Sequence, residues 1–385
     1  MNDALRSEWH TIRRRMVELL STSSCDLTDD YLHIESSFYT SAQRFEKERE
    51  LMQRLPIFVG LSSEIANPGD VMVFDELGPS VLIVRNEQGA ANAFLNVCPH
   101  RGMRLLEQSG NKKDILCPYH AWRFGLDGQL LKRPIDEGFD PEKQDCLTPV
   151  AVAEWAGMLF VQLQSDGAPL DIEAYLGDIA PVLRAMDLGN ATMGFSRTVD
   201  CEANWKLLIE SNSEPYHVPM VHPKTINNWI TPYVYVQDDF GKHHRYASPS
   251  KALKPCVDLD ESEWPESNYS AVHFIYPNVI LTMTGDPDSH LTIQSFFPGR
   301  SVGQSVASNK FYIPFGKATP EKLEQVPFSG EFIMSVLLEE DFPMAEGIWN
   351  NIRALPKPVS LQIGRNENAI QGFHKDLATD TGLPL

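Results

Sequence analysis

The sequence predicts an α+β protein made of two domains. A chain of 385 residues is longer than one hydrophobic core usually serves, which suggests two domains. From about residue 56 to residue 163, short β-prone runs alternate with turn residues, a pattern typical of a small antiparallel β domain. Helical periodicity precedes this region and returns after it. We therefore expect the β domain to be followed by a larger domain of helices and strands.

Two helices are expected before the β-rich region. The first is amphipathic, and its apolar positions are Leu5, Trp9, Ile12, Met16 and Leu19, at spacings of four and three. It belongs to an N-terminal segment, residues 1–40, that should pack on the larger domain. The second helix should cover Ala42–Arg54 and end at Pro56, because proline lacks the backbone N–H that a helix needs.

The β domain should span residues 41–168. Its expected strands are 71–74, 81–84, 93–97 and 157–163. Turn-forming residues separate them, including Pro68-Gly69-Asp70 and Asp127-Gly128.

The second domain should span residues 169–385, after a linker at Gly167-Ala168-Pro169. A helical pattern opens it. The elements expected are a helix at 172–188, strands near 274–284 and 290–297, and a helix at 331–355.

The composition argues against several classes of protein. The net charge of −19 does not suit a general nucleic-acid binder, which needs a basic surface. The apolar runs are far shorter than the roughly 18 residues of a membrane span, and the polar N-terminus does not resemble a signal peptide. Six cysteines in so long a chain do not suggest a disulfide framework. We therefore expect a cytoplasmic protein with reduced thiols and no membrane partner.

The strongest local signal is a pair of motifs, Cys98-Pro99-His100 and Cys117-Pro118-Tyr119-His120. A structural zinc site can use two cysteines and two histidines, but zinc fingers usually pair like with like. A Rieske [2Fe–2S] cluster binds one iron through two thiolates and the other through two imidazoles. Two facing loops with one cysteine and one histidine each would present both irons, so the motifs predict an iron–sulfur site.

These residues carry a family resemblance, since NVCPHRG and CPYHAWRF resemble the Rieske signature C-x-H…C-x-x-H. The resemblance implies four cluster ligands, Cys98, His100, Cys117 and His120. Arg101, Gly102 and Trp122 match positions beside the cluster, where neighbouring groups tune the reduction potential. Ala121 stands where many members have glycine.

The segment around these motifs is basic within an acidic chain. Between Cys98 and Arg133 there are three acids and seven basic residues, Arg101, Arg104, Lys112, Lys113, Arg123, Lys132 and Arg133. They can form an ordinary solvated face, or a docking patch for an acidic electron donor.

A second group of chemistry-bearing residues follows. Glu210, Glu214 and His217 have the spacing of one helix face, and His222 lies five residues beyond His217. We expect Pro219 to break the helix between the histidines, so that the chain turns back and the imidazoles meet. Because a pair of histidines alone is often structural, a third ligand is needed to identify a metal site.

The best candidate for the third ligand is Asp341. In a helix it would share an apolar face with Leu337 and Ile348, where an ionised carboxylate is costly unless it is paired or metal-bound. Glu340 is the neighbouring alternative, and a helix cap or salt bridge is the structural alternative. Two histidines and one carboxylate with open positions form the facial triad of O₂-using non-haem Fe(II) proteins.

NWKLLIESNSEPYHVPMVHP and LLEEDFPMAEG resemble the iron-binding segments of Rieske non-haem iron oxygenases, and the resemblance covers nearly the whole chain. It implies three ligands for a mononuclear iron, His217, His222 and Asp341. Asn204 and Glu210 match positions beside these ligands. Glu214 matches the family's electron bridge, which would link the cluster ligand His120 of one subunit to His217 of the next.

The resemblance also implies a fold and partners. The second domain would be a helix-grip domain, an antiparallel sheet wrapped on a long helix, and the subunits would form a head-to-tail homotrimer. Electrons would come from NAD(P)H through a separate flavin and iron–sulfur reductase or a ferredoxin, since the chain has no G-x-G-x-x-G nucleotide motif. With the cluster, Fe(II) and O₂, the protein would oxidise a small organic substrate.

The substrate class is less constrained. Glu214, where ring-hydroxylating members usually carry Asp, and Ala121 resemble the members that oxidise choline-, carnitine- or betaine-like amines. An aromatic cage for such a cation would come from Trp229, Tyr233, Tyr235, Phe274 and Tyr276. The same rings can instead be core residues. Aromatic-ring hydroxylation and O-demethylation are alternatives, and an electron carrier without the second metal site is the alternative from another class.

Overall fold

The computed structural model describes residues 3–143, 145–264, 269–284 and 290–385. Contacts divide the chain into a β unit, residues 52–175 and 188–190, and an α+β unit, residues 1–51, 176–187 and 191–385. These limits differ from the boundaries expected from the sequence, because most of helix α3 (Ala42–Arg54) belongs to the α+β unit.

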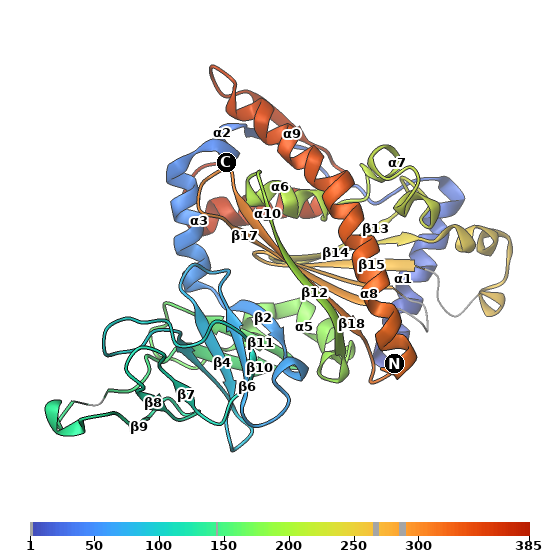
Figure 1. Cartoon of the computed structure of the whole chain (residues 1–385). Helices are drawn as coiled ribbons and strands as arrows, with labels where there is room; N and C mark the ends of the chain where they lie inside the picture. The colour runs from blue at the N-terminus through green and yellow to red at the C-terminus, as the bar shows by residue number, and fades with distance from the viewer. Residues whose placement is uncertain (1–2, 144, 265–268, 285–289) are drawn as a thin grey trace. The chain divides into compact units, whose positions relative to one another are not determined.

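Among its described residues, the β unit contains three antiparallel sheets (Figure 1). The first, in order β10-β11-β2, has strands β10 (Ala151–Trp155), β11 (Met158–Gln162) and β2 (Ile57–Leu61). The second, β5-β4-β3-β6, has β3 (Asp70–Phe74), β4 (Val81–Arg85), β5 (Ala91–Leu95) and β6 (Gly110–Asn111). The third, β7-β8-β9, has β7 (Ile115–Leu116), β8 (Arg123–Phe124) and β9 (Leu130–Lys132). All four strand regions expected from the sequence are present.

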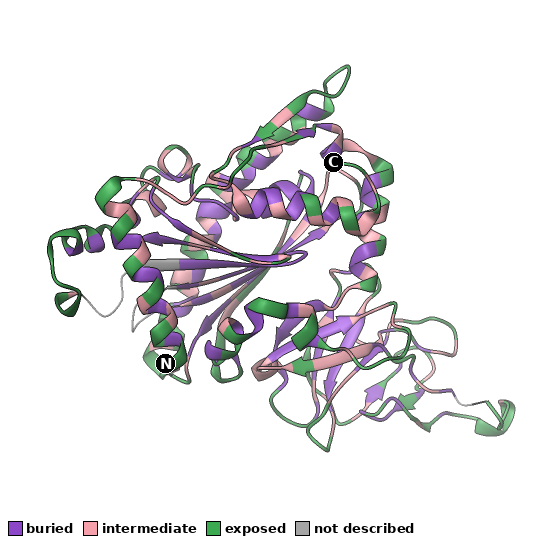
Figure 2. Cartoon of the chain, turned by 180° about the vertical axis from the view of Figure 1, so that it is seen from behind, coloured by how far each residue is buried: buried purple, intermediate pink, exposed green. Residues whose placement is uncertain are grey.

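The α+β unit is built on a seven-stranded antiparallel sheet in the order β12-β18-β17-β16-β15-β14-β13. Its strands are β12 (Thr192–Cys201), β13 (Val236–Phe240), β14 (His243–Pro249), β15 (Tyr269–Ile275), β16 (Val279–Thr284), β17 (Leu291–Pro298) and β18 (Ser305–Ile313). Where the structure describes their side chains, the central strands are largely buried (Figure 2). A separate pair joins β1 (Leu32–Glu35) to β19 (Ser360–Ile363).

The helices of this unit are α1 (Asp3–Thr22), α2 (Ser37–Thr40), α3, α5 (Ala180–Ala185), α6 (Trp205–Ser211), α7 (Val218–Val221), α8 (Pro320–Val336), α9 (Phe342–Arg353) and α10 (Asn368–Thr381). Among them, α1, α6, α8 and α10 contact strands of the sheet. A π-helical turn, Leu337–Asp341, joins α8 to α9, and the resulting long helix crosses one face of the sheet (Figure 1). The expected α+β fold, with an antiparallel sheet and a long helix in the second domain, is confirmed.

Within the described residues, no helix combines the length and the apolar character needed to cross a membrane.

Two elements differ from the sequence expectation for physical reasons. The helix expected at 172–188 is broken into α4 (Ile172–Leu176), a short 3₁₀ turn and α5. Gly177 in that turn has φ +53°, and Pro181 lies in the first turn of α5, where proline is tolerated. The helix expected at 331–355 begins earlier, because Thr319 caps α8 by accepting the Lys322 N–H.

A buried ion pair fixes the helix that leads to the second candidate site. The Lys206 Nζ on α6 lies 2.7 Å from the Glu48 Oε1 on α3, and both side chains are almost fully buried. The Trp205 indole N–H donates to the same carboxylate at 2.9 Å. Since loss of one partner would leave an uncompensated buried charge, this pair holds α6 firmly against α3.

Candidate metal centres and cavity

Cys98 and Cys117 each open a loop with the same backbone hydrogen bonds. In each loop the cysteine carbonyl accepts from the N–H four residues later, that of Gly102 at 2.9 Å and that of Ala121 at 3.1 Å. Both of these residues lie in the left-handed region, with φ +75° and +56°, where glycine is favoured. Each cysteine N–H also donates to the carbonyl five residues later at 2.8 Å. The loops therefore fold alike, and Ala121 tolerates a conformation that glycine would adopt without strain.

The four side chains expected to hold the cluster lie close together. Burial, with the neighbouring Cys117 thiol, raises the pKa of the Cys98 thiol to about 11. The His100 and His120 ring centroids are 4.7 Å apart, and both Nδ1 atoms are buried without a hydrogen-bond partner among the described residues. Leaving such nitrogens unsatisfied is costly, whereas a metal would bind them and deprotonate the thiols. The residues therefore fit a Rieske cluster.

Aromatic contacts hold His100 in place. Trp122 stacks on its ring, with centroids 4.8 Å apart and an interplanar angle of 2°. Phe139 meets His100 edge-on at 5.6 Å and Trp122 at 5.1 Å. Arg101 lies instead over the exposed Tyr119 ring, 5.3 Å from its centroid. Trp122 therefore supports the His100 imidazole directly, whereas Arg101 packs on Tyr119, whose ring lies against His120 with centroids 3.8 Å apart.

Nearby acids neutralise three of the seven basic residues of this segment. The ion pairs are Arg104–Asp75 at 2.9 Å, Arg123–Asp114 at 3.5 Å and Arg133–Asp145 at 2.5 Å. Because Arg133 is also buried, the hypothesis of a basic docking patch now depends on the other four residues, Arg101, Lys112, Lys113 and Lys132.

We expect Cys117→Ser to abolish the visible absorption of the cluster and to lower the melting temperature of the β unit by at least about 10 °C, because metal binding and folding are coupled. Absorption spectra and thermal unfolding followed by circular dichroism measure both effects. Cys146→Ser, at a half-buried cysteine of the same unit, is the matched control and should keep the spectrum. A full spectrum in Cys117→Ser would contradict the ligand assignment.

The second site lies just beyond α6. The expectation of one helix through Glu214 and His217 is wrong, because α6 ends at Ser211. The Glu214 carboxylate accepts the backbone N–H groups of Tyr216 and His217, the latter at 3.1 Å, and so caps the turn into α7. Pro219 lies in the first turn of α7, where it starts that helix and does not break one, and His222 ends it. The short helix α7 thus brings the two imidazoles together.

Three donor atoms form a small triangle at this point. The Nε2 atoms of His217 and His222 are 3.2 Å apart. The Asp341 Oδ1 lies 3.1 Å from the His222 Nε2 and 3.6 Å from the His217 Nε2. Ligands about 2.1 Å from a metal, the length of a metal–imidazole bond, lie about 3.0 Å apart on adjacent corners of an octahedron. The triangle fits a metal ion bound through one face, and Asp341 rather than Glu340 supplies its oxygen.

Each imidazole has its own carboxylate on the opposite side. The His217 Nδ1 is 2.6 Å from the Glu214 Oε1, and the His222 Nδ1 is 2.5 Å from the Glu340 Oε2. Thr225 donates its hydroxyl to the same Glu340 oxygen at 2.6 Å. A carboxylate that accepts the Nδ1–H keeps the proton there and leaves the Nε2 lone pair for a metal. In the π-helical turn, the consecutive residues Glu340 and Asp341 contact the two ring nitrogens of His222, Nδ1 and Nε2.

The two carboxylates also change the acidity of His222. Burial disfavours the protonated ring, but Asp341 and Glu340 outweigh burial and raise the pKa of His222. Burial acts to raise the pKa of Glu340, but hydrogen bonds from Thr225 and His222 lower it overall. Because a divalent ion competes with the proton on His222, metal affinity should fall as the pH is lowered through this raised pKa.

We expect Glu340→Ala to weaken binding of Fe(II) or Co(II) by about 10- to 100-fold, the usual effect of losing an outer carboxylate partner of a metal-bound histidine. Anaerobic metal titrations measure this, and Glu340→Gln, which keeps an acceptor oxygen, should lose less. The exposed neighbour Glu339 provides the matched control, Glu339→Ala. Unchanged affinity in Glu340→Ala would show that Glu340 does not support the site.

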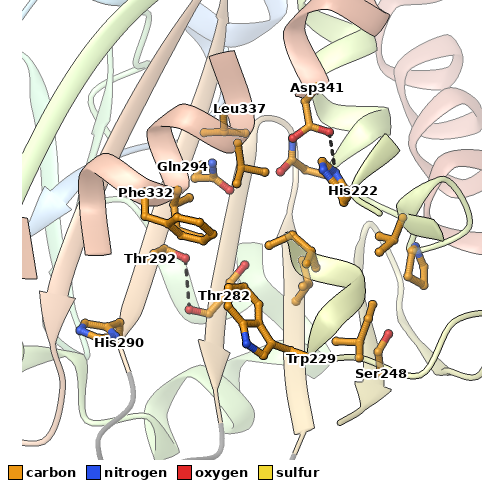
Figure 3. A pocket seen from close by; sticks show the side chains of 18 of the residues that line it. His222, Trp229, Ser248, Thr282, His290, Thr292, Gln294, Phe332, Leu337 and Asp341 are labelled. Carbon is orange, nitrogen blue, oxygen red and sulfur yellow. Dashed lines mark hydrogen bonds and ion pairs between the residues drawn. The ribbon is translucent and has the colours of Figure 1, made fainter. Parts of the chain in front are cut away.

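A cavity of about 790 Å³ lies beside the three donors, and His217, His222 and Asp341 belong to its lining. In Figure 3, Asp341 and His222 lie at one end of the view, and Trp229, Ser248 and His290 lie further along. Phe328 and Phe332 on α8 form part of one wall, and Thr292 and Gln294 on β17 form part of another. Trp229 packs edge-on against Phe332, with centroids 5.6 Å apart.

Only part of the expected aromatic cage lies here. Trp229 lines the cavity. The expectation for Tyr235, Phe274 and Tyr276 is wrong, because all three are 1–2% exposed core residues outside the lining. Phe274 shares a sheet face with the lining residue Val272, but it packs on Phe373 of α10 at 5.5 Å. Strand alternation therefore identified the face, but not which part of that face a helix covers.

The other predicted residues near the iron have structural contacts. Asn204 caps α6 through the Lys206 N–H and donates to the Tyr39 carbonyl at 3.0 Å. Glu210 accepts the Tyr39 hydroxyl at 3.0 Å and lies 3.1 Å from the His374 Nε2. Tyr233, which lies outside the cavity lining, packs on Tyr216 with centroids 5.9 Å apart. Asn204 and Glu210 thus stabilise α6 and its surroundings.

Sequence reasoning missed the polar wall of the cavity. Thr282 on β16 and Thr292 and Gln294 on β17 line it. A signal was present, because Thr292 and Gln294 alternate with buried Leu291 and Ile293. Polar residues at every second position of a buried strand mark a face that is not packed as core.

Comparison with known families defines the class of this protein. Residues 188–381, half of the chain, match the family model described as ring hydroxylating alpha subunit (catalytic domain). Residues 56–145 match the Rieske [2Fe-2S] domain. The chain therefore belongs to the family of ring-hydroxylating alpha subunits.

Named relatives make the likeness more specific. The carnitine monooxygenase oxygenase subunit of Acinetobacter baumannii is 35% identical over 217 residues, 54% of this chain and 57% of the relative. The glycine betaine monooxygenase oxygenase subunit of Chromohalobacter salexigens is 34% identical over 232 residues, 56% of this chain and 52% of the relative. This chain thus spans about half the length of the curated relatives it matches.

Solved structures share the fold. The quaternary ammonium Rieske monooxygenase CntA, in complex with L-carnitine, matches with a TM-score of 0.77 at 23% identity, over 92% of this chain and 96% of that one. Naphthalene 1,2-dioxygenase with bound indole matches with a TM-score of 0.72 at 19% identity, over 91% and 92%. At these identities the likeness concerns the fold alone.

Proposed function

We propose that this protein is the oxygenase component of a Rieske non-haem iron oxygenase. The observation that carries the proposal is the triangle of donor atoms, 3.1–3.6 Å apart, at the wall of a cavity. A protein that only carried electrons would not need this second site. The proposed iron ligands are His217, His222 and Asp341, and the proposed cluster ligands are Cys98, His100, Cys117 and His120.

When bound, the cluster supplies single electrons and Fe(II) activates O₂. The net change would place one oxygen atom of O₂ in a substrate C–H bond, while two electrons and two protons reduce the other oxygen to water. The chain's own residues bind and orient. Glu214 and Glu340 hold the Nδ1 protons of the two imidazoles, and the cavity wall positions the substrate against the open side of the iron site and excludes water.

Electrons would reach the chain from NAD(P)H through a separate reductase or ferredoxin. In a cytoplasmic homotrimer the cluster of one subunit would serve the iron of the next, with Glu214 as the bridge. Its Oε2 accepts two backbone N–H groups and its Oε1 one imidazole, so an acceptor position on Oε1 is left for a second imidazole. The His217 side chain is 21% exposed, against 3% for His222, which also supports a role for His217 at a subunit contact.

The proposed substrate is a quaternary amine or another N-methyl compound. Relatives named for carnitine and glycine betaine support this class, as do the indole of Trp229 and the ring of Phe332 in the cavity, because aromatic faces attract ammonium groups. The same rings, with a relative named anthranilate 1,2-dioxygenase large subunit, support oxidation of an aromatic compound as the alternative.

The decisive experiment combines metal analysis with product analysis. We expect about three irons per chain and a red-brown protein, where a cluster carrier would hold about two irons and a zinc protein would be colourless. The reduced holoenzyme is then given O₂ with a panel of quaternary amines and aromatic acids. An O₂-dependent product from an amine is expected, and a product from the aromatic acids alone would favour the alternative.

A further inference from the structure

The described lining of the cavity contains no permanently charged cation, and apart from the two ligand histidines its one basic side chain is His290. Its lining in the described part of the chain contains no lysine or arginine. An anionic group in the cavity would therefore find no guanidinium or ammonium partner from the lining.

The metal end of the cavity is negative. Three carboxylates, Glu214, Glu340 and Asp341, lie in or directly behind the ligand triangle. With Fe(II) bound and both imidazoles neutral, they leave this end with a net charge of about −1. A substrate cation is attracted here, and a substrate carboxylate is repelled.

The two walls of the cavity offer different contacts. Trp229 and Phe332 meet edge-on at 5.6 Å, and their side chains are partly exposed, so their rings are accessible to a cation. On the sheet side lie Thr282, Thr292 and Gln294. The Thr292 hydroxyl donates to the Thr282 carbonyl at 3.5 Å and the Gln294 amide nitrogen donates to Asn309 at 3.0 Å, so hydroxyl oxygens and the Gln294 side-chain carbonyl remain as acceptors. These groups suit neutral hydroxyl, ester or amide groups of a ligand and cannot neutralise a carboxylate.

From these observations we infer that the substrate is an organic cation without a carboxylate group, held by Trp229 and Phe332, with its neutral polar part against Thr282, Thr292 and Gln294. This inference rests on the proposed oxidation of N-methyl compounds and narrows it. It separates this chain from the relatives named for carnitine and glycine betaine, because both of those compounds carry a carboxylate. A cavity of about 790 Å³ also has room for cations as large as drug-sized ligands.

Choline and glycine betaine form a matched pair of probes, since they share a trimethylammonium group and differ in an alcohol against a carboxylate. Anaerobic calorimetric titration of the iron-loaded holoenzyme should give a Kd for choline at least about 10-fold below that for glycine betaine, because an unpaired buried carboxylate is costly. Glycine betaine binding as tightly as choline would overturn the inference and leave the proposed function standing. If neither amine binds and an aromatic acid does, the inference and the proposed amine substrate both fail, and oxidation of an aromatic compound is favoured.

Two variants test the assigned walls. Trp229→Leu should weaken choline binding about 5- to 30-fold, and Trp229→Phe should lose less, because the smaller ring still provides a π face. Thr292→Lys adds the missing cation and should improve glycine betaine binding relative to choline by at least about 10-fold. Unchanged choline affinity in Trp229→Leu, or an unchanged preference in a folded Thr292→Lys with an intact cluster spectrum, would overturn the assignment.

Discussion

Asp341→Ala is expected to lose the mononuclear iron and all measurable turnover, while the visible spectrum of the Rieske cluster stays intact. The carboxylate supplies the only oxygen of the three-atom donor set among the described residues, and two imidazoles alone hold Fe(II) weakly. Iron analysis should fall from about three to about two per chain. Because the proposed cluster ligands are on other loops, the two metal sites should respond independently.

The adjacent acid provides the control for this result. Glu340 accepts a hydrogen bond from the Nδ1–H of His222. The Glu340→Ala variant should therefore bind iron more weakly, but it should still bind iron when Fe(II) is in excess. Were Asp341→Ala to keep its iron while Glu340→Ala lost it, the iron ligand would be Glu340 and not Asp341.

Glu214→Gln should slow electron transfer from the cluster to the iron by orders of magnitude in a single turnover. The neutral amide cannot accept N–H groups from the backbone and from two imidazoles as the carboxylate can. With excess Fe(II), both metal sites should remain occupied, since no ligand is changed, and the cluster should still be reduced. Rapid-mixing absorption at the cluster bands measures reoxidation directly.

The matched control is Glu340→Gln, because Glu340 bears the same relation to His222 that Glu214 bears to His217. A general effect of losing a histidine's carboxylate would slow both variants equally. We expect only Glu214→Gln to lose the transfer step. Equal single-turnover rates in Glu214→Gln and the unchanged protein would leave the bridge without support.

The sequence predicted which donor side chains come together better than it predicted the backbone that carries them. Residue type determines which side chains can bind a metal. Two cysteines, four histidines and Asp341 could therefore be selected before any fold was known. The route of the chain could not. The turn that Glu214 caps and the start of α7 at Pro219 depend on local hydrogen bonds that helical spacing does not reveal.

The cavity shows the same limit at a larger scale. Trp229 was found, but Tyr235, Phe274 and Tyr276 are core residues. A strand pattern tells which residues share a face, whereas a cavity exists only where no helix covers that face. The packing of α10 on Phe274 through Phe373 is a long-range contact, and no local pattern in the sequence encodes it.

The long helix that carries one wall of the cavity also carries the proposed iron ligand Asp341. Phe328 and Phe332 line the cavity on α8, and Asp341 follows at the end of the π-helical turn. A shift of α8 along its axis to enlarge the cavity would also move the Asp341 carboxylate away from the two imidazoles. New specificities in this scaffold should therefore arise by trimming or exchanging side chains on α8, with its backbone unmoved. Insertions or deletions between Phe332 and Asp341 would change the cavity wall and would also displace Asp341 from the proposed iron site.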